Sequence, residues 1–120
     1  MLETLRAWRA SKGAECLLIK GARQVGKTYI IAEFGRLDYE NFVSIDFIES
    51  PELKEVFDGP LDADTIYRQI SLVVPGARFV PGKTLLFLDE IQECPAARAA
   101  LKYLALDGRC DVVASGSLLG

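Results

Sequence analysis

The segment that decides the fold is Gly21-Ala22-Arg23-Gln24-Val25-Gly26-Lys27-Thr28. The apolar run 16–19 before it is typical of a buried strand, and the run 29–34 after it is compatible with a helix. Two glycines allow successive backbone N–H groups to converge on an anion, and a helix that begins near Lys27 adds further N–H groups and the positive end of its dipole. The segment therefore predicts a phosphate-binding loop between a strand and a helix.

The same segment fits the pattern G-x-x-x-x-G-K-[ST], known as the P-loop or Walker A motif. In this pattern Lys27 is expected to reach the β- and γ-phosphates of a nucleotide, and the Thr28 hydroxyl to bind Mg²⁺. The alternative is a glycine turn that matches by chance, which the strand before it and the helix after it disfavour. The residues expected to bind the nucleotide are Gly21, Ala22, Arg23, Gln24, Val25, Gly26, Lys27, Thr28 and Tyr29.

A second motif, at residues 85–90, consists of four apolar residues followed by Asp89 and Glu90. A phosphate loop needs an acid on a neighbouring strand to hold the metal, and we expect Asp89 to meet Mg²⁺ through a bound water. Glu90 should point in a different direction and accept a proton from the water that attacks the γ-phosphate. The alternative is a pair of solvated acids at the end of a strand.

Further polar residues lie where neighbouring strands are expected to end. Ser115 and Ser117 either touch the γ-phosphate or orient the attacking water, or they form an ordinary polar turn. Gln92 either orients the same water or faces solvent, and Asp46 is more readily explained as a cap than as part of the site. The catalytic residues that we expect are Lys27, Glu90 and Ser115.

The composition limits the chemistry that the chain can perform. With 120 residues, half of them apolar, it can form one domain with a core, and a net charge of −3 gives no basic field for nucleic acid or membrane. The absence of histidine excludes Ser-His-Asp and Cys-His nucleophiles and histidine-containing zinc sites. Three cysteines without metal spacing favour a reducing, cytoplasmic compartment. The sequence has neither a secretory signal nor an apolar run near the roughly 20 residues of a membrane span.

Strands and helices are expected to alternate along the chain, which predicts an α/β fold with a parallel sheet and helices on both faces. The expected strands are 16–19, 41–47, 84–89 and 111–115. The first two expected helices are residues 2–11, ended by Gly13, and a helix that follows the phosphate loop and is ended by Gly35. The others are residues 51–57 with Ser50 as N-cap, a helix that begins at Asp62 or Asp64, and a helix that starts at Pro95 and is ended by Gly108. The helix positions expected to face the core are Ile66, Ile70, Val73, Ala97, Leu101 and Leu104.

The segments 21–28, 88–92 (Leu-Asp-Glu-Ile-Gln) and 114–120 (Ala-Ser-Gly-Ser-Leu-Leu-Gly) together resemble the AAA-type P-loop ATPases of bacteria and archaea. The resemblance runs from about residue 2 to residue 120, and it points to the group with an uncharacterised C-terminal domain. It implies a three-layer ASCE fold with sheet order 5-1-4-3-2, with ATP and Mg²⁺ as cofactors. It also implies that Asp89 and Glu90 are the Walker B pair and that Ser115 is the sensor on the fourth strand.

Family members continue beyond the point where this sequence ends, with a fifth strand, a helical lid and a further domain. We therefore expect residues 1–120 to be the N-terminal part of one ATPase domain, truncated after its fourth strand, with the first strand at an edge of the sheet. The arginine finger and the lid arginine would lie beyond Gly120, or a finger would come from another subunit of an oligomer. Lack of the finger would slow hydrolysis by a factor of about 10³–10⁵.

The function that these motifs predict is Mg-dependent ATP hydrolysis coupled to movement of attached domains. Two alternatives are a nucleotide-binding regulatory switch with little turnover and a P-loop kinase for a small molecule. A GTPase is disfavoured because the sequence contains no Asn-Lys-x-Asp segment, and a helicase because the other helicase motifs are missing. The client, whether nucleic acid or protein, stays open.

Overall fold

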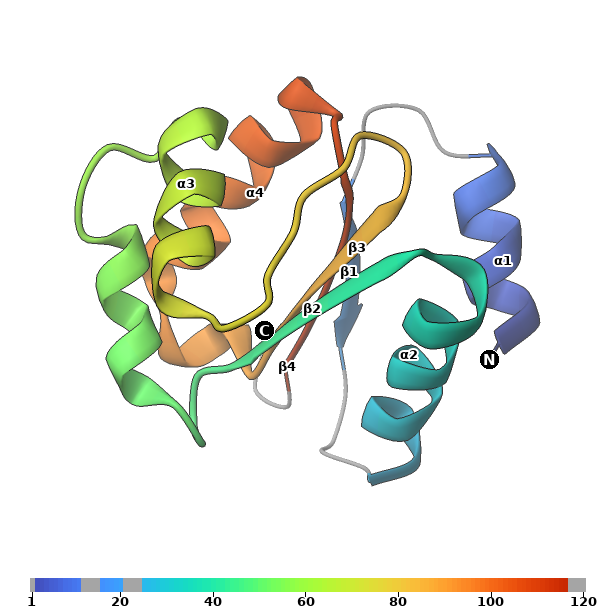
Figure 1. Ribbon diagram of the computed structural model, residues 1–120. Coiled ribbons are helices and arrows are strands. Elements are labelled where there is room, and N and C mark those ends of the chain that lie inside the picture. Colours follow the sequence, from blue (N-terminus) through green and yellow to red (C-terminus); the bar gives the residue numbers. More distant parts are fainter. Residues whose placement is uncertain (1, 12–15, 21–24, 117–120) are drawn as a thin grey trace.

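The computed structural model describes residues 2–11, 16–20 and 25–116 of the chain. Within these ranges one sheet of parallel strands lies between two layers of helices (Figure 1). The strands are β1 (Leu17–Lys20), β2 (Asn41–Asp46), β3 (Thr84–Asp89) and β4 (Asp111–Gly116). The helices are α1 (Leu2–Ser11), α2 (Val25–Asp38), α3 (Ala63–Val73) and α4 (Pro95–Asp107), with the short 3-10 helices η1 (Pro51–Phe57) and η2 (Ile91–Glu93).

The strand order of the sheet is β1-β4-β3-β2, and all three neighbouring pairs are parallel. This order confirms the predicted α/β fold, and it agrees with the 1-4-3-2 part of the order that the family resemblance implies. The register pairs Asp46 with Asp89 and Asp89 with Ser115. Because parallel strands end at the same edge, the sheet brings these three residues together at its carboxyl edge.

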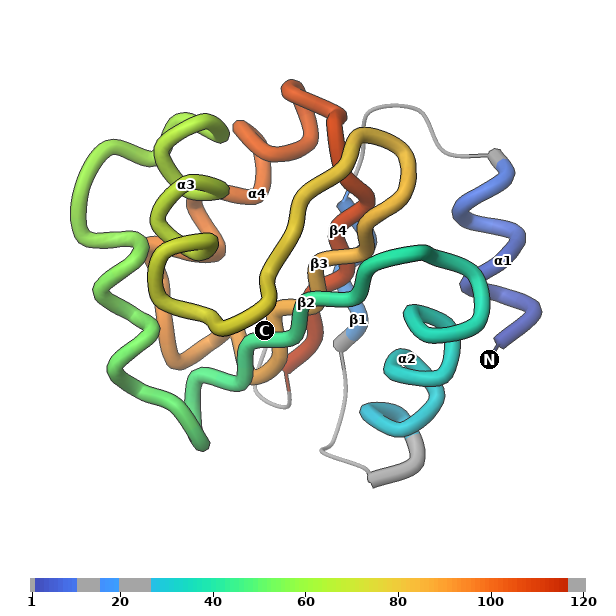
Figure 2. The backbone as a smooth tube through the Cα atoms, viewed as in Figure 1, coloured from blue at the N-terminus to red at the C-terminus, as the bar shows by residue number. Residues whose placement is uncertain are grey.

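Both faces of the sheet are covered by helices, as the backbone trace also shows (Figure 2). Every residue of β3 is buried, which fits a central strand of a parallel sheet. Alternate residues of β3 point to opposite faces. Leu85 and Phe87 join a core with residues of α1 and α2, and Leu86 and Leu88 join the larger core with α3 and α4.

Gly35 does not end the second helix, contrary to our prediction, because α2 continues to Asp38. A Cβ atom at Gly35 would lie 2.2 Å from Cδ1 of Phe42. The Phe42 ring stacks on Phe87 of the central strand, with the ring centroids 6.5 Å apart. The glycine is therefore explained by the close approach of α2 to the Phe42 ring of β2, and not by a turn.

The segment 51–57 is helical as predicted, but it forms a 3-10 helix and the Ser50 side chain makes no capping hydrogen bond. Asp62 caps α3, since its Oδ2 accepts from the Thr65 N–H at 3.0 Å. The inward position predicted for Val73 is wrong, because Val73 lies in the last turn of α3 and is 50% exposed.

The fourth helix has the predicted limits. It starts at Pro95, and Gly108 follows it in the left-handed conformation at φ 68°. Ala97 and Leu104 are buried as expected, and Leu101 is partly buried. Proline at a helix start and glycine just after its end are the usual signals, so this helix was well specified by sequence.

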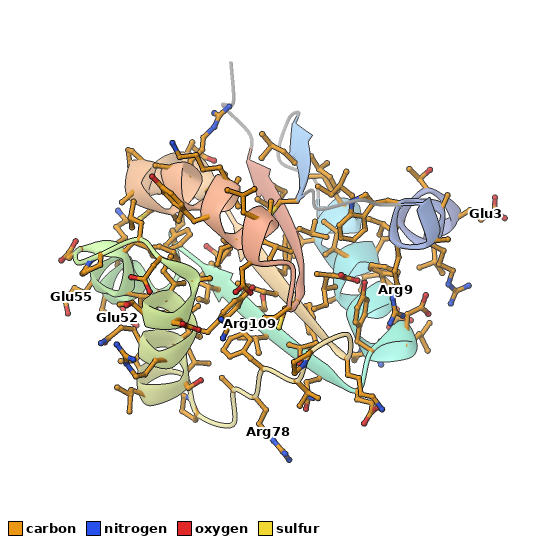
Figure 3. All side chains as sticks on the ribbon, turned by 90° about the horizontal axis from the view of Figure 1, so that it is seen from above. Glu3, Arg9, Glu52, Glu55, Arg78 and Arg109 are labelled. Atoms are coloured by element: carbon orange, nitrogen blue, oxygen red, sulfur yellow. The ribbon has the colours of Figure 1, made fainter. Side chains whose placement is uncertain are left out.

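Arginine side chains connect the elements at the amino edge of the sheet. Arg109, just before β4, pairs with Asp64 at the start of α3 and donates at 2.7 Å to Asp107 at the end of α4 (Figure 3). Arg9 of α1 lies over the Tyr39 ring at 3.9 Å on the other side of the sheet. These contacts fix both helical layers at the edge opposite to Asp89.

None of the described helices combines the length and the apolar character needed to cross a bilayer.

Candidate functional site

The start of α2 lies at the carboxyl edge of the sheet, as the predicted strand–loop–helix unit requires. β1 ends at Lys20 and α2 begins at Val25. The predicted loop residues Gly21, Ala22, Arg23 and Gln24 lie outside the described residues. The first turns of a helix carry N–H groups without partners in the helix and the positive end of its dipole, which favour an anion.

Asp89 is the residue on which the site converges. Thr28 Oγ1 of α2 donates to Asp89 Oδ2 at 3.3 Å, and Ser115 Oγ of β4 donates to Asp89 Oδ1 at 2.8 Å. The Glu90 backbone N–H also donates to Oδ1, at 2.9 Å. The structure thus brings together three predicted site residues that lie on α2, β3 and β4.

The environment of the Asp89 carboxyl disfavours its ionised form. Burial raises the pKa of Asp89 above its ordinary value, and the charges of Asp46 and Glu90 act in the same direction, whereas the hydrogen bonds from Ser115 and the Glu90 N–H lower it. Asp89 is 7% exposed. A cation beside this carboxylate would stabilise its ionised form.

The donor atoms at this edge fit Mg²⁺. Thr28 offers a hydroxyl oxygen and Asp89 a carboxylate, which are the hard ligands that Mg²⁺ prefers. Within the described part of the chain no three His, Cys, Asp or Glu side chains gather to hold a metal. That is compatible with Mg²⁺, which usually binds one or two protein ligands together with phosphate oxygens and water.

Asp46 lies beside Asp89 in the sheet but forms a local turn. Its Oδ1 accepts from the backbone N–H groups of Ile48 at 2.8 Å and Glu49 at 3.1 Å. The capping interpretation, which the sequence favoured, is therefore confirmed. Asp46 still acts on the site, because its charge contributes to the raised pKa of Asp89.

Glu90 leaves the strand in an unusual backbone conformation. Its φ of 56° and ψ of 47° are left-handed, and among the described residues it is the only non-glycine with positive φ. Such a conformation costs on the order of 1–3 kcal/mol and is concentrated at functional sites. The side chain is buried, at 2% exposure. The turn at Glu90 therefore directs a second carboxyl away from the regular alternation of β3.

Gln92 does not simply face solvent, which is one of the two roles that the sequence left open for it; the other role, orienting the attacking water, stays a prediction. The Gln92 Nε2 atom donates to Glu90 Oε1 at 3.0 Å, so the amide contacts the predicted base directly. No sequence signal indicated this contact, because it depends on the left-handed turn at Glu90 and on the 3-10 helix η2 that follows.

The other predicted residues are placed as follows. Ser115 is buried, and its hydroxyl contacts Asp89. Lys27 lies in the first turns of α2 and is partly buried, and the Tyr29 side chain is 63% exposed. Ser117 lies outside the described residues.

The parallel sheet, with strand order β1-β4-β3-β2, and the helix that starts at its carboxyl edge agree with a P-loop NTPase-like fold. A comparison with protein families matches residues 14–120 to the family described as "AAA domain". The chain belongs to this AAA domain family, and it is a nucleotide-binding domain of the AAA type. A search of curated proteins found no match to the chain.

Proposed function

We propose that this domain binds Mg·ATP, hydrolyses it to ADP and phosphate, and couples hydrolysis to the movement of attached domains. The observation that carries the proposal is the 3.3 Å contact between Thr28 Oγ1 and Asp89 Oδ2. It joins the first turns of α2, where phosphates would bind, to the carboxyl end of β3, where an acid is needed.

In the proposed complex the phosphates lie against the loop and the N-terminus of α2. The backbone N–H groups of residues 21–29 hold the β- and γ-phosphates, and the Lys27 ammonium pairs with them. Thr28 and Asp89 are the residues that would hold Mg²⁺, which would supply positive charge to the phosphate oxygens. The buried position of Asp89 strengthens its attraction to a cation.

In the proposed reaction a water oxygen forms a bond to the γ-phosphorus as the bond to the β–γ bridging oxygen breaks, and ADP leaves with that oxygen. Glu90 accepts the proton of the attacking water. Ser115 orients Asp89 through its hydrogen bond and contacts the γ-phosphate side of the site.

The three cysteines are free thiols in the structure, which supports a reducing, cytoplasmic location.

The proposal is tested by single-turnover hydrolysis of Mg·[γ-³²P]ATP with the protein in excess, so that slow chemistry is detected. Glu90→Gln should retain Mg·ATP binding but lower the hydrolysis rate by about 10²–10⁴-fold, the usual contribution of a general base. The matched control is Glu93→Gln, which changes an exposed acid at the end of η2 and should hydrolyse ATP like the wild type. ATP binding by the wild type without any phosphate release would contradict hydrolysis and identify a switch.

A further inference from the structure

The short helix η2 holds Gln92 against the carboxyl group of Glu90. We infer that Gln92 is a positioning residue that fixes the Glu90 carboxylate for proton abstraction; this inference rests on the proposed role of Glu90 as the base. Gln92 Nε2 donates to Glu90 Oε1 at 3.0 Å.

The backbone of this turn is well anchored. The N–H of Glu93 donates to the carbonyl of Glu90 at 3.0 Å, and the N–H of Cys94 donates to that of Ile91, also at 3.0 Å. The Ile91 side chain is fully buried in the larger core. Gln92 is therefore carried by a rigid single turn, and its side chain folds back toward Glu90, two residues earlier.

The amide orientation is fixed by the chemistry of its partner. A carboxylate only accepts hydrogen bonds, so the Gln92 amide must present its NH₂ group to Glu90. The Gln92 Oε1 atom is then buried, with no hydrogen-bond partner among the described residues. A buried acceptor without a partner is unfavourable. Through this orientation the Gln92 amide presents its donor to the Glu90 carboxyl group.

The consequence for the proposed reaction is geometric. A general base must lie within hydrogen-bond reach of the proton that it accepts, and small displacements of a reacting group are costly in rate. The left-handed backbone at Glu90 sets the direction of its side chain, and the Gln92 bond restricts the rotation of its carboxyl group. Gln92 thus acts through Glu90 without touching the nucleotide.

Two variants remove the donor, add no charge and stay close to the size of the side chain, Gln92→Met and Gln92→Leu. We expect each to lower the single-turnover rate by about ten- to a hundredfold. The Kd for Mg·ATP, measured by calorimetry, should stay within about twofold of the wild type, because binding does not depend on the position of the base. In a Glu90→Gln background the same substitutions should cause no further loss, and a thermal melt of each variant reports whether folding is affected.

The outcomes separate the inference from the proposed function. Suppose that Glu90→Gln abolishes hydrolysis, whereas the Gln92 variants fold normally and hydrolyse ATP like the wild type. The positioning role is then wrong and the base assignment stands. A faster rate in either Gln92 variant would also contradict it, since the bond would then restrain the base. A further loss in the Glu90→Gln background would show that Gln92 acts elsewhere. Wild-type turnover in Glu90→Gln would overturn the base assignment, and the positioning role with it.

Discussion

The hydroxyl of Ser115 donates a hydrogen bond of 2.8 Å to Asp89 Oδ1 across the parallel pair β3–β4. Both residues are buried, and they are direct partners in the register. The serine therefore holds the carboxyl group on which the whole site converges. The family resemblance implied a sensor at Ser115, and the structure adds that its hydroxyl donates a hydrogen bond to the Asp89 carboxyl group.

Replacing Ser115 by alanine should weaken Mg·ATP binding. The variant leaves the buried Asp89 carboxylate with one donor fewer, and hydrogen bonds to charged groups contribute about 1.5–3 kcal/mol. We expect the Kd for Mg·ATP in calorimetry to rise by roughly ten- to a hundredfold, on the scale of about 1.4 kcal/mol per tenfold. Ser71→Ala, which removes a hydroxyl that donates to the Tyr67 carbonyl in α3, is the control and should bind normally. Unchanged affinity in Ser115→Ala would show that the bond does not matter for the site.

The raised pKa of Asp89 predicts that Asp89→Asn stabilises the nucleotide-free domain at neutral pH. Burial is the main cause of the raised pKa, so the folded state binds the proton more tightly than the unfolded state. Above the pKa of the folded state, the ionised carboxylate lowers the free energy of unfolding by its full amount. This penalty shrinks as the pH falls below that pKa, and it is gone below the pKa of the unfolded state, about 3.9. Asparagine keeps an acceptor for Ser115 and removes the penalty. Urea unfolding should show the stabilisation at neutral pH and its decline toward about pH 4.

Asp62→Asn is the contrasting control for this prediction. The hydrogen bonds from Thr65 lower the pKa of Asp62, so its charge stabilises the fold above the ordinary pKa, and this contribution is lost as the pH falls through the lowered value. Asparagine is also a good N-cap, so only the charge changes. The effect at neutral pH should be opposite in sign to that of Asp89→Asn. If both variants shift stability in the same direction, the electrostatic account of Asp89 is wrong.

Gly35→Ala should destabilise the domain although alanine is the better helix former. The added Cβ would meet the Phe42 ring at 2.2 Å, and overpacking of this kind costs about 1–3 kcal/mol. The gain from helix propensity is only about 1 kcal/mol. Gly59→Ala is the matched control, because nothing lies within 4 Å of its added Cβ. Denaturant melts should show a lower free energy of unfolding for Gly35→Ala and little change for Gly59→Ala. Adding Phe42→Leu to Gly35→Ala should restore part of the lost stability. Equal stability of both alanine variants would contradict the packing argument.

The sequence predicted the parts of the fold whose signals are local. The apolar run that ends in Asp89 predicted a central strand, and proline and glycine marked both ends of α4. The meeting of Thr28 with Asp89 followed from the parallel sheet, since strands that run in one direction end at one edge.

The errors arose where the reason lies in a distant neighbour. Gly35 looked like a helix stop because glycine often follows helices, but the structure requires it for the approach of Phe42. Val73 fits the helical period of its neighbours, yet α3 ends there and the residue stays half exposed. The contact of Gln92 with Glu90 depends on one left-handed residue, and no periodicity reports that conformation.

The most direct test of the site is calorimetry with Mg·ATP on the wild type, on Lys27→Ala and on Lys102→Ala. Lys102 is an exposed lysine of α4 whose ammonium lies 5.0 Å from the Tyr103 ring, so its replacement controls for the loss of a positive charge. We predict saturable binding by the wild type and by Lys102→Ala, and at least about tenfold weaker binding by Lys27→Ala, because in the proposed complex the lysine pairs with two phosphates. Equal affinity of Lys27→Ala and the wild type would contradict the phosphate site at the start of α2.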